Sequence, residues 1–373
     1  MGLTPLVLAL SVLGAGGLPD DWVARGITCN SRTGLSHPPP LCAPDDKCTD
    51  LFPSYAIYGT SEVTEEQHEA TCARGFGFLG KDDGPPKEIN VPTDFAPGGV
   101  RKRKYCLYEP RGTRLPLVIW FHGSSGSAGN VYDITGLRDK AETWRLDDGN
   151  EGFLLATPQS LNRHWPPRVI GESGAKHDYI YRDWEKNEDF RFVDRMIDEL
   201  VASGKADPNR IFVTGWSNGC IFSMAYGIVR YTTPTPAGNR VAAIAGFSGV
   251  DPFTAVGIDI GCILAEYPKP NPPLMLVSKD CDVIPCFLVE TWVAWLRSSG
   301  GEENTNFLLI NSNGDQVSEC AGLTSCDPAT ALVNHLAWPS SREDEMLQWL
   351  KAHPLDATAP GPGPGPSPTT TGG

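Results

Sequence analysis

The sequence is poor in features that mark several classes of protein. Its eleven cysteines include no Cys-x-x-Cys pair, so the common spacing of structural zinc sites and redox motifs is missing. It contains no Asn-x-Ser/Thr acceptor site, and N-glycosylation is therefore not expected. Positive charge is scarce: the formal net charge is -14, which argues against nucleic acid and anionic membranes as partners.

The apolar segment at the N-terminus, residues 3–17, is too short to span a bilayer. It ends in small residues, as a secretory signal peptide does, although no Lys or Arg precedes it. Pro19 and the acidic pair Asp20 and Asp21 follow, which disfavours a buried N-terminal helix. We therefore predict a signal peptide over residues 1–18. The many cysteines agree with export, and we predict a secreted, extracellular and monomeric protein.

The length of 373 residues permits one large α/β domain with appendages, or two domains, and 40% hydrophobic residues are enough for a core. Residues 19–86 are rich in Cys and Pro without clear periodicity, which predicts a disulfide-rich N-terminal extension. Residues 87–354 are expected to form the catalytic domain. Residues 355–373 are rich in Pro, Gly and Thr, which predicts an extended tail or a linker.

Residues 87–354 alternate between strand-like and helix-like segments. Strands are predicted at 103–108, 115–121, 153–157, 211–216, 242–247 and 274–277, and helices at 189–203, 220–229 and 342–352. Such alternation implies an α/β fold with a mainly parallel central sheet flanked by helices. In such folds ligands bind at the carboxyl ends of the strands.

A Gly-x-Ser-x-Gly turn at residues 215–219 places Ser217 at one of these strand ends. The five letters alone are a weak motif in a chain with 40 glycines. Their flanks strengthen it, because a β-type run precedes the turn and a helix-forming stretch follows it. A serine in such a sharp strand-to-helix turn is exposed as a nucleophile. The alternative is an ordinary serine in a surface turn.

A serine hydroxyl needs a base within hydrogen-bond reach, and His335 is the best placed of seven histidines. It lies in a predicted loop just before the last helix, where the base belongs in a Ser…Asp…His chain order. The alternative is a structural or solvent-facing histidine. His122 instead ends the strand 115–121, and we expect it to shape the loop that follows rather than to act as the base.

The third group should be an aspartate in the loop after the strand 274–277. Counting from the strand end favours Asp282, whereas the Asp-x-x-Val spacing favours Asp280. We choose Asp282 and keep Asp280 as the alternative. Cysteines on both sides of Asp282 could brace this loop against the segment that precedes His335, through Cys281 and Cys286 on one side and Cys320 and Cys326 on the other.

The backbone N–H groups of Asn218 and Ser124 are the candidate oxyanion donors, because one follows the nucleophile and the other lies in the His-Gly-Ser-Ser loop. Trp165 and Trp216 could line an aromatic acyl or sugar site together with His122. The alternative for both tryptophans is the hydrophobic core.

Five ordered segments resemble a known family. They are residues 98–110 (GGVRKRKYCLYEP), 120–126 (WFHGSSG), 187–194 (NEDFRFVD), 207–219 (DPNRIFVTGWSNG) and 335–339 (HLAWP). The order and spacing are similar to those of the secreted α/β-hydrolases that group polyhydroxybutyrate depolymerases with feruloyl and acetylxylan esterases. The resemblance implies an α/β-hydrolase fold over about residues 87–352, with Ser217 as nucleophile, His335 as base and Ser124 as an oxyanion donor. Cys220 and Asn334 depart from the family pattern, and the acid loop does not align with it.

The predicted function is a secreted serine carboxylic ester hydrolase that uses a Ser-His-Asp mechanism without metal or organic cofactor. The expected substrates are polymeric and are the feruloyl or acetyl esters of the plant cell wall. One alternative is a polyhydroxyalkanoate depolymerase, and another is a peptidase or thioesterase on the same fold. An alternative of another class is a catalytically silent carbohydrate-binding protein.

Overall fold

The computed structural model describes residues 71–73, 82–93, 96–145, 151–163, 165, 185, 187–232, 240–252, 271–300, 302–321 and 326–355. The predicted signal peptide, most of the predicted extension and all of the predicted tail beyond Leu355 lie outside these ranges. The domain boundaries inferred for those segments therefore remain predictions.

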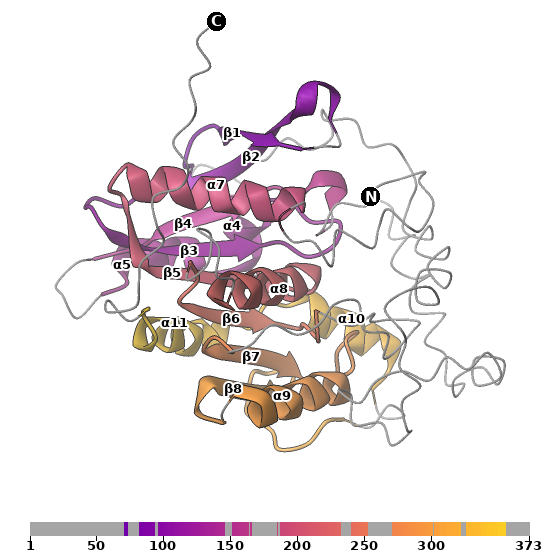
Figure 1. The fold of residues 1–373 in the computed structure, drawn as a ribbon. Coiled ribbons are helices and arrows are strands. Elements are labelled where there is room, and N and C mark those ends of the chain that lie inside the picture. The colour runs from indigo at the N-terminus through magenta and orange to yellow at the C-terminus, as the bar shows by residue number, and fades with distance from the viewer. Residues whose placement is uncertain are drawn as a thin grey trace, which may run out of the picture.

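A single eight-stranded sheet organises the described chain, in the order β1-β2-β4-β3-β5-β6-β7-β8 (Figure 1). The strands are β1 (Lys87–Pro92), β2 (Val100–Tyr108), β3 (Leu115–Phe121), β4 (Leu154–Pro158), β5 (Ala206–Trp216), β6 (Ala243–Phe247), β7 (Leu274–Lys279) and β8 (Thr305–Ile310). The β1–β2 and β2–β4 pairs are antiparallel, and all other neighbours are parallel. This mixed sheet, covered by helices, is the architecture of the α/β-hydrolase fold, and the predicted fold class is confirmed.

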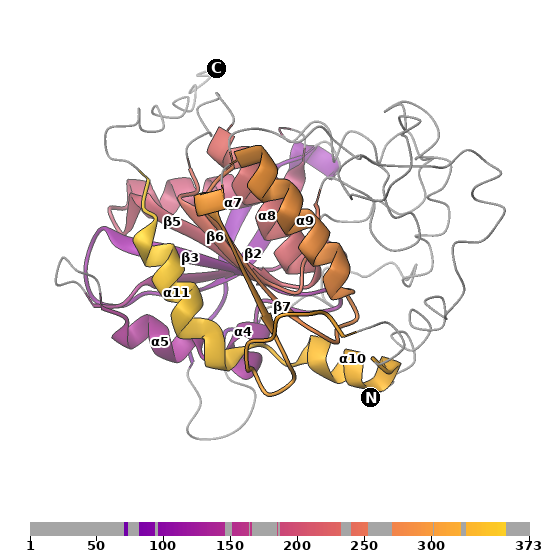
Figure 2. The same cartoon turned by 90° about the horizontal axis from the view of Figure 1, so that it is seen from below.

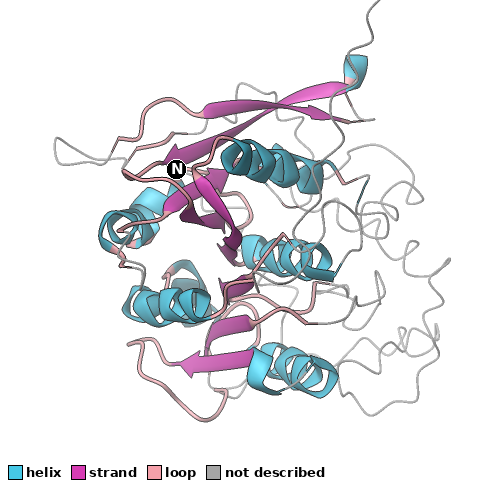
Figure 3. Ribbon diagram, turned by 60° about the vertical axis from the view of Figure 1, so that its left-hand side comes forward, coloured by secondary structure: helices cyan, strands magenta, loops and turns pink. Residues whose placement is uncertain are grey.

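Helices cover both faces of the sheet, as the views in Figures 2 and 3 show. The helices of one face are α7 (Glu188–Ala202), α8 (Asn218–Thr232) and α9 (Cys286–Gly300), whose apolar residues join one core cluster. The helices of the other face are α4 (Asn130–Ile134), α5 (Leu137–Thr143) and α11 (Glu343–Ala352), which belong to a second cluster. Because the sheet is buried on both faces, its central strand β3 is apolar and buried at every position.

One further helix, α10 (Pro328–Leu336), lies close to the C-terminal end of β7 (Figure 2). Its start follows from local chemistry: Asp327 caps the N–H groups of Ala329 and Thr330, and Pro328 occupies the first turn. We expected a loop at residues 333–339. That expectation was wrong for His335, because this capped segment is helical through Leu336.

The described end of the extension is attached to the body of the fold. Cys72 forms a disulfide with Cys106 in β2. Asp83 accepts two hydrogen bonds from the Arg138 guanidinium, at 2.6 and 2.7 Å, and one from the Tyr132 hydroxyl at 2.7 Å. The Cys72–Cys106 disulfide and two further disulfides, described below, indicate an oxidising environment. Within the described residues, no helix is both long and apolar enough to cross a membrane.

Candidate active site

The site is built at the carboxyl ends of three adjacent parallel strands, β5, β6 and β7. Ser217 follows β5, Ser248 follows β6, and Asp282 lies three residues beyond the end of β7. The backbone joins these ends: Ser217 N donates to Phe247 O at 3.0 Å, and Ser248 N donates to Val277 O at 2.9 Å. Strand ends therefore hold these side chains together, as expected for a parallel sheet.

The structure explains why glycines flank Ser217 on both sides. Ser217 has a φ of 56°, a left-handed conformation that a non-glycine residue rarely adopts. A side chain at Gly219 would collide with the carbonyl oxygens of Phe121 and His122, and one at Gly215 would collide with the backbone of Gly219. The turn is thus tight enough to exclude a Cβ at both Gly215 and Gly219. It leaves Ser217 partly exposed at the end of a buried strand.

The three residues selected from the sequence as nucleophile, base and acid are brought together by the fold. Ser217 Oγ lies 2.9 Å from His335 Nε2, and His335 Nδ1 lies 2.7 Å from Asp282 Oδ1. The same Asp282 oxygen accepts the N–H of Ile284 at 2.9 Å. An imidazole held between a hydroxyl and a carboxylate can take the serine proton and remain oriented while it carries the positive charge.

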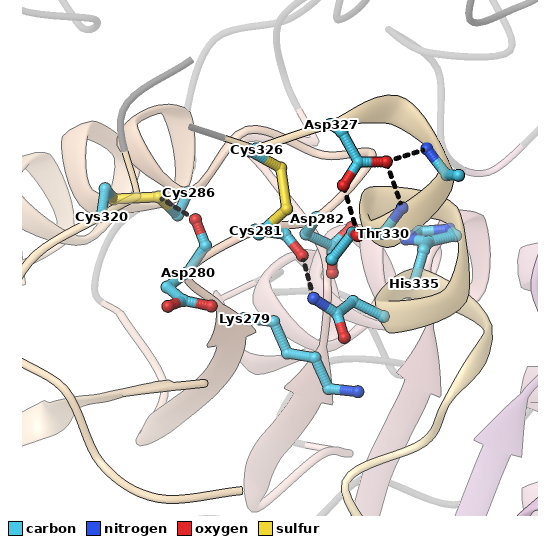
Figure 4. Close-up of a disulfide and its surroundings, with 12 residues drawn as sticks. Lys279, Asp280, Cys281, Asp282, Cys286, Cys320, Cys326, Asp327, Thr330 and His335 are labelled. Atoms are coloured by element: carbon cyan, nitrogen blue, oxygen red, sulfur yellow. Dashed lines mark hydrogen bonds and ion pairs between the residues drawn. A yellow bond between two sulfur atoms is a disulfide. The ribbon is translucent and has the colours of Figure 1, made fainter. Parts of the chain in front are cut away.

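Asp280 takes no part in this chain of hydrogen bonds. Its backbone N–H donates to Ile310 O at 2.8 Å, and its carbonyl accepts from Ala321 N at 3.2 Å. Figure 4 shows its carboxylate directed away from His335. Of the two alternatives that the sequence left open, the geometry therefore selects Asp282 as the partner of the histidine.

Three hydrogen bonds anchor the C-terminal end of the helix that carries His335, part of which is drawn in Figure 4. The side-chain amide of Asn334 donates to Cys281 O at 2.7 Å. Lys279 Nζ donates to Ala337 O at 2.9 Å, just beyond the helix C-terminus. Trp216 Nε1 donates to His335 O at 2.7 Å. These contacts fix the imidazole through its backbone.

Lys279 reaches that position as a nearly buried amine. Burial lowers the pKa of its ammonium group, and the charges of Asp282 and Asp280 oppose this effect. Its Nζ also lies 5.8 Å from the centroid of the Phe247 ring. Lys279 was not selected from the sequence, and its hydrogen bond is made to the end of the His335 helix.

Two disulfides complete the anchoring, and the bracing that we expected from the cysteine positions is confirmed. Cys281 pairs with Cys326, directly before the Asp327 cap of α10, and Cys286 pairs with Cys320. The first bond connects the residue next to Asp282 with the start of the His335 helix (Figure 4). The pairing itself was not predictable from spacing.

Removing the Cys281–Cys326 bond should lower both stability and turnover. The Cys281→Ser/Cys326→Ser variant is expected to lose about 2–4 kcal/mol of unfolding free energy and about tenfold in kcat. The matched control is Cys72→Ser/Cys106→Ser, which opens a loop of 34 residues against 45 and lies five strands away, about 24 Å. It should lose similar stability while keeping kcat. Equal kcat in both variants would show that the bond does not position the site.

His122 shapes the loop that faces Ser217 and does not line a substrate site. It is fully buried, and its Nδ1 donates to Gly123 O at 2.8 Å while Nε2 accepts from Ser160 N at 3.3 Å. The substrate-binding role predicted for its side chain is therefore corrected. Ser124, the candidate oxyanion donor in the same loop, is exposed.

Asn218 is the first residue of α8, where a helix leaves its N–H groups without intrahelical partners. Its side chain clamps the backbone of Trp165: Oδ1 accepts from Trp165 N, and Nδ2 donates to Trp165 O, both at 2.7 Å. The Trp165 ring is buried and stacks on Phe222 at 4.9 Å between centroids. Its predicted contact with substrate is thus also corrected, since the ring belongs to the core. Trp216 remains partly exposed beside Ser217, and its binding role stays a prediction.

Within the described part of the chain, no group of His, Cys, Asp or Glu side chains is arranged to hold a metal ion. The one buried free thiol there, Cys220, has a raised pKa because burial disfavours the thiolate.

Comparisons with known proteins find structural likeness only. No protein-family model matches the chain, and no curated protein matches it significantly. A thermostable esterase is 17% identical with a TM-score of 0.42, over 72% of this chain and 63% of that one, which is less than two thirds of its length. An S-formylglutathione hydrolase from Agrobacterium tumefaciens is 13% identical with a TM-score of 0.44, over 72% and 95% of the two chains. An esterase from Pyrobaculum calidifontis is 12% identical with a TM-score of 0.42, over 72% and 85%.

Proposed function

We propose that this chain is a secreted serine carboxylic ester hydrolase. The observation that supports this most directly is the continuous hydrogen-bonded series Ser217, His335, Asp282, with the serine on a strained strand-to-helix turn. Strain of this kind persists where the surrounding structure imposes it, and it is concentrated at functional sites. The three disulfides of the described chain agree with a secreted protein.

The proposed reaction is acyl transfer in two halves. His335 Nε2 takes the proton of Ser217 as Oγ attacks the ester carbonyl, which gives a tetrahedral oxyanion. The backbone N–H groups of Ser124 and Asn218 stabilise that oxyanion. His335 then returns the proton to the leaving alcohol, and the acyl group stays on Ser217. Water, activated by the same imidazole, attacks the acyl-enzyme and releases the acid.

The proposed substrates are feruloyl or acetyl esters on plant cell-wall polymers, with hydroxyalkanoate polyesters as the alternative. The sequence segments quoted above support this substrate class. Trp216 supports an aromatic acyl group in particular, because its partly exposed indole is next to Ser217 in the chain and lies 5.8 Å from the His335 ring. A flat ring can stack there with little loss of side-chain freedom.

Two measurements test this proposal in sequence. A fluorophosphonate probe should label Ser217 in the full chain, as read by peptide mass spectrometry, and failure to label would favour a catalytically silent protein. Hydrolysis of methyl ferulate, acetylated xylan and polyhydroxybutyrate films should then favour one of the first two substrates over the film. Preference for the film would transfer the assignment to polyester depolymerisation. Faster cleavage of an amide than of the matched ester would indicate a peptidase.

A further inference from the structure

We propose that Ser248 is a fourth polar member of this site, a positioning residue that sets the tautomer and orientation of His335. The inference rests on the proposed function, since it concerns the same imidazole. Ser248 Oγ lies 3.0 Å from Asp282 Oδ1 and 2.9 Å from His335 Nδ1. With the 2.7 Å bond between His335 and Asp282, these contacts close a triangle of three groups.

The direction of each hydrogen bond follows from the chemistry of the triangle. An ionised carboxylate only accepts hydrogen bonds, so the single hydroxyl proton of Ser248 donates to Asp282 Oδ1. The remaining lone pairs of Ser248 Oγ then face His335 Nδ1, which must carry a proton to donate a hydrogen bond to them. Two acceptors, Ser248 Oγ and Asp282 Oδ1, therefore hold the same N–H of the imidazole.

This arrangement has a catalytic consequence. With the proton held on Nδ1, the other nitrogen Nε2 carries the lone pair that faces Ser217 Oγ at 2.9 Å. In the other tautomer, with the proton on Nε2, the lone pair of Nδ1 would face the oxygens of Ser248 and Asp282, which is repulsive. Ser248 also stabilises the imidazolium that forms when Ser217 attacks, because its oxygen dipole lies against the charged ring.

Ser248 has a backbone conformation that is strained for a residue with a side chain. Its φ is 55°, in the region that favours glycine, and the residue is fully buried. Glycine would fit this conformation better, yet a serine occupies it. The hydrogen bond of its N–H to Val277 O holds it against the end of β7. The hydroxyl, which is the group that glycine lacks, accounts for the choice.

The test compares Ser248→Ala and Ser248→Gly with wild type in the full chain, with p-nitrophenyl acetate as substrate. Both variants lose the hydroxyl, but only the glycine relieves the strain. We expect kcat to fall about ten- to a hundredfold in both, with KM within about twofold, because a hydrogen bond to a charged group is lost. The control is Ser223→Ala, which removes an equally buried serine whose Oγ bonds Cys220 O in α8, and it should keep wild-type kcat.

A double-variant cycle separates positioning from general stability. In an Asp282→Asn background, the His335 tautomer is already disturbed, so adding Ser248→Ala should cost less than about threefold. The rate of fluorophosphonate labelling of Ser217 should fall in parallel with kcat in each variant. The positioning role would be overturned if Ser248→Ala lowered kcat by the same factor in the Asp282→Asn background as in wild type. It would also be overturned if Ser248→Gly had wild-type kcat.

Wild-type behaviour distinguishes this inference from the proposed function. Wild type that hydrolyses esters while both Ser248 variants match it would remove the positioning role alone. Wild type that neither hydrolyses the ester nor reacts with the probe would remove the proposed function, and the positioning role with it.

Discussion

Ser217→Ala should lower kcat for short p-nitrophenyl esters by about a millionfold. The reason is that the hydroxyl of Ser217, which lies 2.9 Å from His335 Nε2, is the nucleophile proposed to form the acyl-enzyme. The backbone donors and the binding surface remain, so a small residual rate above water is expected. The measurement is steady-state hydrolysis by purified protein, with wild-type contamination excluded by active-site titration.

The matched control for Ser217→Ala is again Ser223→Ala, which changes a buried serine in the helix that follows the turn. It should retain activity and fold, as judged by circular dichroism. The Ser217→Ala substitution should relieve the backbone strain at this position only slightly, because alanine at a positive φ is strained too. Melting temperatures of the two variants should therefore be close to that of wild type. Substantial ester hydrolysis by Ser217→Ala would exclude the mechanism.

Asp282→Asn should lower kcat by about ten-thousandfold, whereas Asp280→Asn should change it by less than about threefold. The asparagine presents an N–H or a weaker acceptor to His335 Nδ1, so the imidazole loses both its preferred tautomer and the stabilisation of its positive charge. The Asp280 carboxylate makes no hydrogen bond to His335. The hydrogen bonds of Asp280 to Ile310 and Ala321 are made by its backbone.

The comparison between these two variants is informative because they change the same chemical group in the same loop. Both carry the same change of charge, and both lie close to the Cys281–Cys326 bond. Activities of wild type, Asp280→Asn and Asp282→Asn would be measured in parallel under the same conditions. Loss confined to Asp280→Asn would reverse the assignment of the acid.

The parts of the site that were predictable from sequence are those set by local geometry and chain order. A sharp turn around Ser217 needs glycines at fixed offsets, and the structure shows the backbone contacts that exclude any larger residue there. Alternating strands and helices implied a parallel sheet, and such a sheet brings successive strand ends together. The position of His335 near the end of the chain followed from the same order.

Other features depended on side-chain direction and burial, which no local pattern carries. Asp280 and Asp282 are equivalent in composition, and only the path of the loop turns one of them towards His335. His122 and Trp165 were predicted to line the substrate site, yet both side chains are buried. Ser248 gave a weak sequence signal, a Ser-Gly pair after an apolar strand, and its role emerged only from a triangle of contacts.

Chain order and local turn chemistry were thus enough to name Ser217, His335 and an aspartate of the 280–282 loop, because those requirements are short-range. Tertiary packing decided which aspartate, which cysteines pair and how the His335 helix is anchored. The physical reason is that hydrogen bonds and disulfides between distant segments require both partners to be placed within a few tenths of an ångström. That placement is a property of the folded sheet and its helices, and not of any one segment.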